Sequence, residues 1–126
     1  MRSTLAGCLA LAIAGCGSGV SLPTGTIVGG SGPTAAVTIQ DFAYTPAQLT
    51  IKAGTRVNWT NNGPSPHSAT ADSTGGFDSG SLTPPKSSGS GGVTPGELFQ
   101  MHFTTPGTYT YHCMFHPQMH GTITVQ

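Results

Sequence analysis

Three residues with metal-binding side chains recur at every third position near the C-terminus. Cys113, His116 and Met119 offer a thiol, an imidazole and a thioether within the segment CMFHPQM. Pro117 cannot continue a central strand, so the chain should turn here, and a turn can fold His116 and Met119 back toward the cysteine sulfur. The spacing therefore predicts a loop that could hold a metal ion.

A further donor, His67, lies far upstream in a loop. The segment NNGPSPH ends at this histidine and follows a strand-like run. In an antiparallel sandwich, this loop and the loop of residues 113–119 can open at the same end. We therefore predict that His67, Cys113, His116 and Met119 converge on one metal ion.

The chemistry of these four donors favours copper. Thiolate and thioether sulfurs suit Cu(I), imidazole suits both oxidation states, and two histidines, a cysteine and a weak axial methionine form the blue-copper arrangement. Zinc is the alternative, because it also accepts cysteine and histidine, and His120 could be its fourth ligand. Zinc rarely takes a thioether such as Met119, however, and neighbouring residues on an extended segment point apart. Copper is thus the predicted ion.

The N-terminal segment MRSTLAGCLALAIAGCGSG has the features of a secretory leader. Arg2 precedes an apolar run over residues 5–14, which is too short for a stable membrane-spanning helix. The run ends in IAGC, which resembles the bacterial lipobox, in which the cysteine receives lipid and becomes the new N-terminus. We expect residues 1–15 to be a signal peptide and Cys16 to be lipidated. An ordinary signal peptide with a chance cysteine is the alternative.

Loss of the leader changes the cysteine count. Of the three cysteines, Cys8 would be removed and Cys16 acylated, so that only Cys113 remains as a free thiol. An unpaired cysteine in an oxidising compartment needs a reason. Metal ligation is one reason, and burial as an inert, small hydrophobic residue is the other.

The sequence predicts that the rest of the chain consists of a flexible tether and one β-rich domain. Residues 16–34 are mostly Gly, Ser, Thr and Pro, which predicts a flexible tether. Residues 35–126 contain many short strand-like runs separated by turns, and no helical period, which indicates a β-sandwich. Residues 73–96 predict a long surface excursion in which Phe77 and Leu82 are apolar anchors.

Alternation along two strands predicts which side chains enter the core. In RVNWT, Val57 and Trp59 share a face that should point inward. In GTYTYHC, Tyr111 and Cys113 also share a face, so the thiol should end a core strand while His112 points outward. The alternation in AVTIQDF is imperfect, which suggests a shift of phase near residue 41.

These residues also carry a resemblance to a known family. The pattern C-x-x-H-x-x-M, the preceding GTYTYH, the upstream His67 and the run F-x-Y-x-P-x-x-L-x-I-x-x-G-x-x-V-x-W-x-N over residues 42–61 resemble the cupredoxins. The short loop with Pro117 resembles amicyanin more than plastocyanin. The resemblance covers most of residues 36–126, apart from the excursion. It implies an all-β, Greek-key β-sandwich of about seven or eight strands that binds one type 1 copper ion.

Two positions depart from the family pattern. Ser68 stands where many relatives have Asn, so its backbone N–H could still bond the copper thiolate, while side-chain bracing between the two loops could be lost. Met114 stands where Ser or Thr is frequent. Groups around the ligands tune redox potential, so these departures bear on the electronic properties of the site.

The resemblance and the donor set together predict a one-electron carrier outside the plasma membrane, anchored there through Cys16. We expect a monomer that docks transiently with a redox partner through an apolar surface near His116, which includes Met114, Phe115 and Pro117. We expect no small-molecule substrate. The alternative is a copper-binding or copper-delivery protein without a carrier role.

Other classes of function receive little support. Charged residues make up 6% of the chain and the formal net charge is zero, so no basic surface for nucleic acid is expected. Copper enzymes need further copper sites with more histidines, commonly as His-x-His pairs. This chain has five histidines and no such pair. We expect no enzymatic activity, and we interpret His102, His112 and His120 as surface residues, with His112 as a secondary exit for electrons.

Overall fold

The computed structural model describes residues 32–126. These residues form ten strands and no helix, and hence contain no helix that could cross a membrane. The predicted signal peptide of residues 1–15, the lipidation of Cys16 and nearly all of the predicted tether of residues 16–34 lie outside the described residues. The first strand begins at Thr34.

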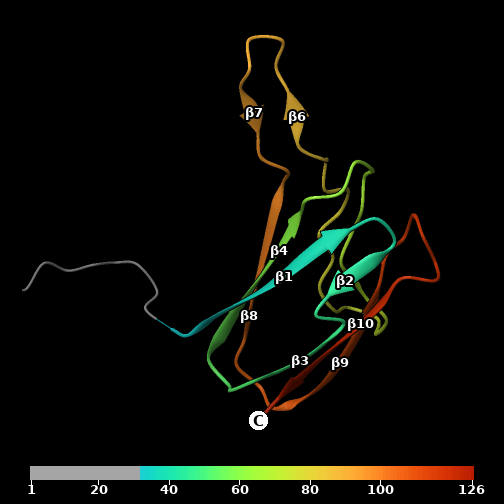
Figure 1. Ribbon diagram of the computed structural model, residues 1–126. Coiled ribbons are helices and arrows are strands. Elements are labelled where there is room, and N and C mark those ends of the chain that lie inside the picture. Colours follow the sequence, from blue (N-terminus) through green and yellow to red (C-terminus); the bar gives the residue numbers. More distant parts are fainter. Residues whose placement is uncertain (1–31) are drawn as a thin grey trace, which may run out of the picture.

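Two four-stranded sheets pack face to face (Figure 1). In spatial order, the first sheet contains β2 (Ala43–Thr45), β1 (Thr34–Gln40), β4 (Thr55–Asn61) and β8 (Leu98–Phe103). The second sheet contains β3 (Gln48–Ile51), β10 (His120–Val125), β9 (Gly107–His112) and β5 (Thr70–Ala71). The predicted all-β sandwich is therefore confirmed.

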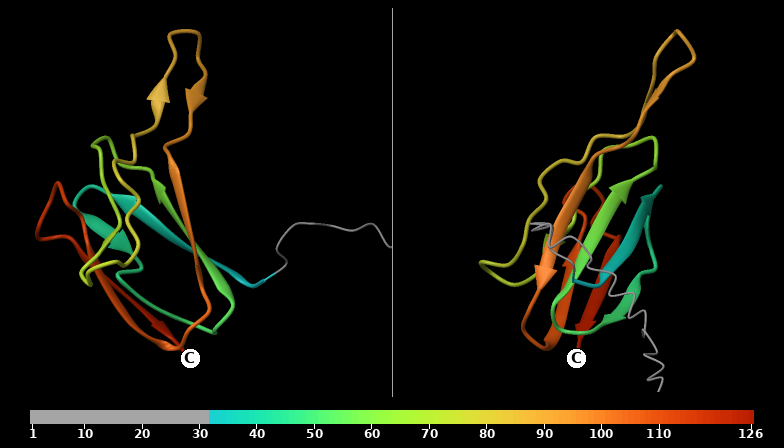
Figure 2. Two further views of the ribbon diagram at one scale, coloured as in Figure 1. Left: turned by 180° about the vertical axis from the view of Figure 1, so that it is seen from behind. Right: turned by 90° about the vertical axis from the view of Figure 1, so that its left-hand side faces the viewer.

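A separate hairpin adds the remaining two strands to the described part of the chain. It pairs β6 (Lys86–Ser87) with β7 (Val93–Thr94) and projects from one end of the sandwich, as both views in Figure 2 show. Within the same excursion, Phe77 and Leu82 are only 8% and 4% exposed, which confirms them as its apolar anchors.

Both sheets are mixed, so the antiparallel arrangement assumed for the two ligand loops holds for only some of the strand pairs. β1 pairs in parallel with β4, and β3 pairs in parallel with β10, whereas the other pairs are antiparallel. The reason is the route of the chain, which passes from the first sheet to β3 in the second sheet and then returns as β4. Parallel neighbours require such a crossover, because a tight turn always reverses direction.

The core lies between the sheets and follows the alternation of the strands. Val57 and Trp59 on β4 are fully buried, while the alternate residues of the strand are half-buried, as the sequence predicts. The Trp59 ring lies 5.4 Å from Phe77 and 5.7 Å from Tyr111 of the second sheet, so it bridges the two layers. This packing holds the ends of β4 and β9 at a constant separation, and the loops that follow these two strands carry the predicted metal ligands.

Candidate metal centre

Two loops far apart in sequence bring three of the predicted donors together. Cys113 directly follows β9, and the Nδ1 atoms of His67 and His116 lie 3.8 Å and 3.7 Å from its sulfur. The three donor atoms all lie within 4.8 Å of one another. His67 and Cys113 are fully buried, whereas His116 is half-buried and forms the side of the group nearest solvent. The predicted convergence of His67, Cys113 and His116 is therefore present in the fold.

The loop from Cys113 to Met119 is closed by its own backbone. The His116 N–H donates to the Cys113 carbonyl at 3.2 Å, and the Met119 N–H donates to the His116 carbonyl at 2.9 Å. The Cys113 N–H in turn donates to the Met119 carbonyl at 3.1 Å. Met119 is buried in the same core cluster as Cys113, so its thioether, like the Cys113 thiol, is shielded from water.

The position of His67 is set by two residues from other parts of the chain. The buried amide of Asn61 donates to the carbonyls of Ser65 and Leu82 and accepts the N–H of Gly63, which defines the path of the loop after β4. His67 and Leu82 then exchange two backbone hydrogen bonds, of 3.2 Å and 2.7 Å. The surface excursion therefore pairs directly with a predicted ligand.

Ser68 couples the two loops through both its backbone and its side chain. Its N–H donates to the Cys113 sulfur at 3.4 Å, as expected. Its hydroxyl accepts the N–H of Met114 at 2.9 Å and also pairs with the Thr70 hydroxyl at 3.0 Å. The expectation that serine at this position loses the bracing is therefore wrong, because the short hydroxyl reaches a backbone N–H of the facing loop.

Tyr44 supports the same region from the first sheet. Its hydroxyl donates to the Ser68 carbonyl, and its ring packs edge-on against Tyr111 at 4.7 Å. Both backbone groups of Ser68 are thus engaged, the N–H by the sulfur of Cys113 and the carbonyl by Tyr44. The two peptide groups on either side of the Ser68 Cα are therefore both held by hydrogen bonds, which leaves the neighbouring His67 little freedom.

The electrostatic environment suits metal binding by His67. Burial, and then the nearby His116, lower the pKa of His67 below its ordinary value. The neutral imidazole is therefore favoured, and this is the form that offers a lone pair to a metal.

The donor set fits copper. It combines two imidazole nitrogens with a thiol, and a thioether lies buried beside them. Within residues 32–126 no carboxylate joins this group, so the hard cations that need oxygen ligands are poorly served. Sulfur and imidazole donors in a closed apolar setting match the preferences of copper.

Phe42 is a contact of the centre that sequence reasoning missed. Its ring lies edge-on to His116, with 4.9 Å between ring centroids, and 6.5 Å from His67. Its φ of 59° is in the left-handed region, which is rare for an aromatic residue, and this explains the imperfect alternation near residue 41. The irregular alternation and the family-like run over residues 42–61 both pointed to Phe42, and that run also contains Tyr44 and Asn61. Neither signal assigned these residues a role beside the metal ligands.

The residues predicted to lie at the surface do so. His102 and His120 are exposed, and His112 is about one-third exposed. Met114 and Phe115, predicted for the surface near His116, are 50% and 45% exposed, and Phe42 adds a third large apolar side chain at 54%.

Comparisons with known proteins agree with this site. Residues 33–126 match the family described as copper binding proteins, plastocyanin/azurin family. The chain is 32% identical over 117 residues to plastocyanin from Prochlorothrix hollandica, with 85% of this chain and 87% of the relative covered. It is 29% identical over 135 residues to amicyanin from Paracoccus denitrificans, with 100% and 95% covered.

A solved structure supports the fold. The novel purple cupredoxin from Nitrosopumilus maritimus superposes with a TM-score of 0.62 at 28% identity, and the alignment covers 73% of this chain and 99% of that chain. The expected cupredoxin fold is thus confirmed. Because the family match spans nearly all of the described residues, including the four predicted donors, the chain belongs to the plastocyanin/azurin family of copper-binding proteins.

Proposed function

We propose that this protein carries single electrons between redox partners outside the plasma membrane. The observation that carries the proposal is the convergence of two histidine nitrogens on one buried cysteine sulfur. A copper ion held by His67, Cys113, His116 and Met119 would supply reversible one-electron chemistry between Cu(I) and Cu(II).

The residues around the donors favour this role because they limit movement. The N–H of Ser68 donates to the Cys113 sulfur, and its hydroxyl fastens the facing loop through Met114. The backbone hydrogen bonds between Cys113, His116 and Met119 hold the second loop. A set of donors that keeps its positions needs little rearrangement when an electron arrives or leaves.

The exposed surface around His116 suits a transient partner. Phe42, Met114 and Phe115 are large apolar side chains that remain about half exposed. The Phe42 ring contacts the His116 ring, and Met114 and Phe115 lie between Cys113 and His116 in the sequence. Such a group marks an interaction surface. Because the chain carries few charges, we expect the rate of association with a redox partner to depend only weakly on ionic strength.

The proposed location rests on the N-terminal sequence. An apolar run that ends in a lipobox-like IAGC motif supports export and a lipid anchor at Cys16, and the Gly/Ser-rich residues that follow support a tether for a monomeric domain. Mass spectrometry of the purified native protein tests this. An acylated N-terminal Cys16 is expected, and an uncleaved or unacylated chain would contradict the anchor.

The visible spectrum of the copper-loaded protein, oxidised and then reduced, tests the carrier role. We expect an intense thiolate-to-copper band that disappears on reduction and returns on oxidation with copper retained. The variant Cys113→Ser should lose the band, while Met119→Gln should keep copper bound and change its redox potential. An unchanged band in Cys113→Ser would overturn the ligand assignment, and release of copper to an acceptor protein in each cycle would favour copper delivery instead.

A further inference from the structure

Two histidines outside the buried centre face each other across neighbouring strands. His112 on β9 and His120 on β10 are directly opposed in the antiparallel register, and their ring centroids are 6.5 Å apart. Residues opposed in this way project from the same face of a sheet. Their neighbours Tyr111, Cys113 and Gly121 are buried, so the two imidazoles lie on the outer face of the second sheet.

A carboxylate holds one of these rings in a defined state. Nδ1 of His112 lies 2.6 Å from Oδ1 of Asp72. A carboxylate can only accept a hydrogen bond, so Nδ1 carries the proton, and in the neutral ring the lone pair is on Nε2. Metal-binding histidines commonly donate their other N–H to a carboxylate in this manner.

Asp72 is itself positioned by the sheet. Its backbone N–H donates to the Thr110 carbonyl at 3.0 Å, which extends the pairing of β5 with β9 to the residue two positions before His112. A hydrogen bond with the Thr110 side chain, and then the one with His112, lower the pKa of Asp72 below its ordinary value. The carboxylate therefore stays ionised and adds negative charge next to the two histidines.

We propose that His112 and His120 form a second metal site, on the surface, for a divalent transition ion such as Zn²⁺ or Cu²⁺. Asp72 is the positioning residue of this site, and water completes the coordination. Two imidazoles that share an ion at about 2 Å each must approach more closely than 6.5 Å between centroids. The exposed ring of His120 can turn to achieve this, because nothing buries it.

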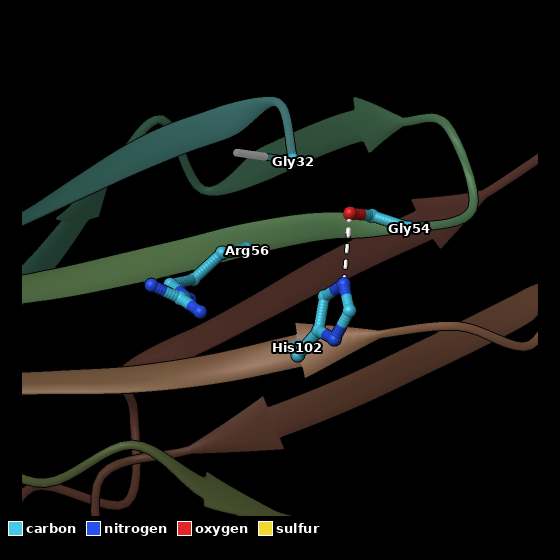
Figure 3. A pocket seen from close by; sticks show the side chains of 4 residues that line it. All are labelled: Gly32, Gly54, Arg56 and His102. Atoms are coloured by element: carbon cyan, nitrogen blue, oxygen red, sulfur yellow. Dashed lines mark hydrogen bonds between the residues drawn. The ribbon is translucent and has the colours of Figure 1, made fainter. Parts of the chain in front are cut away.

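The chain offers a matched control in His102. This histidine is also exposed, but its Nε2–H donates to the Gly54 carbonyl at 2.8 Å, and Arg56 lies beside it (Figure 3). His102 is opposed to Arg56 near the start of β4, whereas His67 follows the end of that strand. His102 therefore lies at the end of the sandwich opposite to His67, with no histidine opposed to it. The positive charge of Arg56, its cross-strand partner, disfavours metal binding.

Calorimetric titration of the copper-loaded full chain with Zn²⁺ tests the proposal, while the visible band is followed to show that the buried centre keeps its copper. We expect one Zn²⁺ to bind per chain. The variants His112→Gln and His120→Gln should each weaken binding by roughly tenfold or more, and Asp72→Asn by roughly 10- to 100-fold. His102→Gln should bind Zn²⁺ as tightly as the unchanged protein, and all variants should keep the visible band.

Two results would overturn the second site. One is no saturable Zn²⁺ binding by the unchanged protein. The other is binding that His120→Gln leaves intact, or that His102→Gln weakens equally, since either would show that the histidines act as independent surface groups. Neither result bears on the electron-carrier proposal, which depends on the visible band alone.

Discussion

Ser68 couples the two loops of the copper centre through its backbone nitrogen and its side-chain oxygen, which are only three covalent bonds apart. Its N–H points to the Cys113 sulfur and its hydroxyl accepts the N–H of Met114 in the facing loop. A longer side chain such as Asn could brace the loops through other groups, but the hydroxyl suffices because the loops approach closely here. The identity of one small residue thus affects both the support of the sulfur and the fit of the loops.

Replacing Ser68 by Ala separates these two contributions. The backbone N–H to the sulfur should remain, so copper should still bind with a visible band. The part-buried N–H of Met114 would lose its acceptor, which should lower the free energy of unfolding by about 1–2 kcal/mol. Urea unfolding followed by circular dichroism measures this.

The exposed Ser81 provides the control for that experiment. Ser81→Ala should change stability by no more than about 0.5 kcal/mol. If Ser68→Ala were equally neutral, the hydroxyl would not brace the loops.

At the level of elements, the excursion of residues 73–96 is part of the architecture of the site. It returns to the sandwich at Leu82, whose backbone pairs with His67 in both directions and whose carbonyl also accepts the Asn61 amide. The side chain of Leu82 is buried in the core. Anchoring of the excursion therefore also anchors a ligand.

The variant Leu82→Ala should loosen this anchor. Loss of the buried side chain should lower the free energy of unfolding by about 2–5 kcal/mol. The backbone amides of His67 and Leu82 should also exchange hydrogen faster than the rest of the core, as measured by NMR on the native state.

Val93→Ala is the matched change within the same excursion, because Val93 is 67% exposed on the β6–β7 hairpin. We expect it to leave both stability and amide exchange near their original values. Equal effects of the two substitutions would mean that Leu82 has no special role in holding His67.

The pairing of β9 with β10 depends on a glycine. Gly121 is opposed to Tyr111, and a Cβ atom at Gly121 would overlap the Tyr111 ring. The ring therefore lies directly over the backbone of the neighbouring strand. This packing connects β9, which ends just before Cys113, with β10, which begins just after Met119.

Gly121→Ala should consequently displace the Tyr111 ring and destabilise the fold by about 1–3 kcal/mol. Thr124→Ala on the same strand, at a half-buried position, should cost less. Thermal unfolding of the two variants compares them, and a Gly121→Ala protein as stable as the parent would show that the ring can move at no cost.

At the scale of the whole molecule, two tyrosines, Tyr44 and Tyr111, are buried with their phenol groups in the one apolar core. Burial raises the pKa of Tyr111 to about 12, and burial, followed by the charge of Cys113, also raises the pKa of Tyr44. The folded state thus favours the neutral phenol. Because the folded pKa lies above the unfolded value near 10, this stabilisation is complete below pH 10 and is lost as the pH rises from 10 through 12.

We therefore expect the free energy of unfolding to fall with increasing pH above about 10, with Tyr111 contributing on the order of 2–3 kcal/mol. Tyr111→Phe should make this fall shallower, because phenylalanine has no proton to lose. Urea unfolding between pH 8 and pH 12 measures both slopes. Parallel curves for the two proteins would contradict the assignment of the effect to this phenol.

The donors of the centre were predictable because their chemistry is local. Cys113, His116 and Met119 stand within one short segment, and the selection among metals follows from the types of their atoms. The inward faces of β4 and β9 were predictable for a similar reason, since alternation with a period of two residues states which side chains share a face. The amino-acid sequence alone therefore determined the β-rich class, the core strands and the candidate ligands.

Apart from the approach of His67 to Cys113, the contacts between distant segments were decided by the tertiary structure alone. The parallel pairing of β1 with β4, the hydroxyl of Ser68 on the facing loop and the ring of Phe42 against His116 all join segments far apart in the chain. The same holds for the approach of Asp72 to His112. Such contacts depend on strand register and crossover, because a one-residue change of register moves the side chains of a strand to the opposite face, and no local pattern records which segments meet.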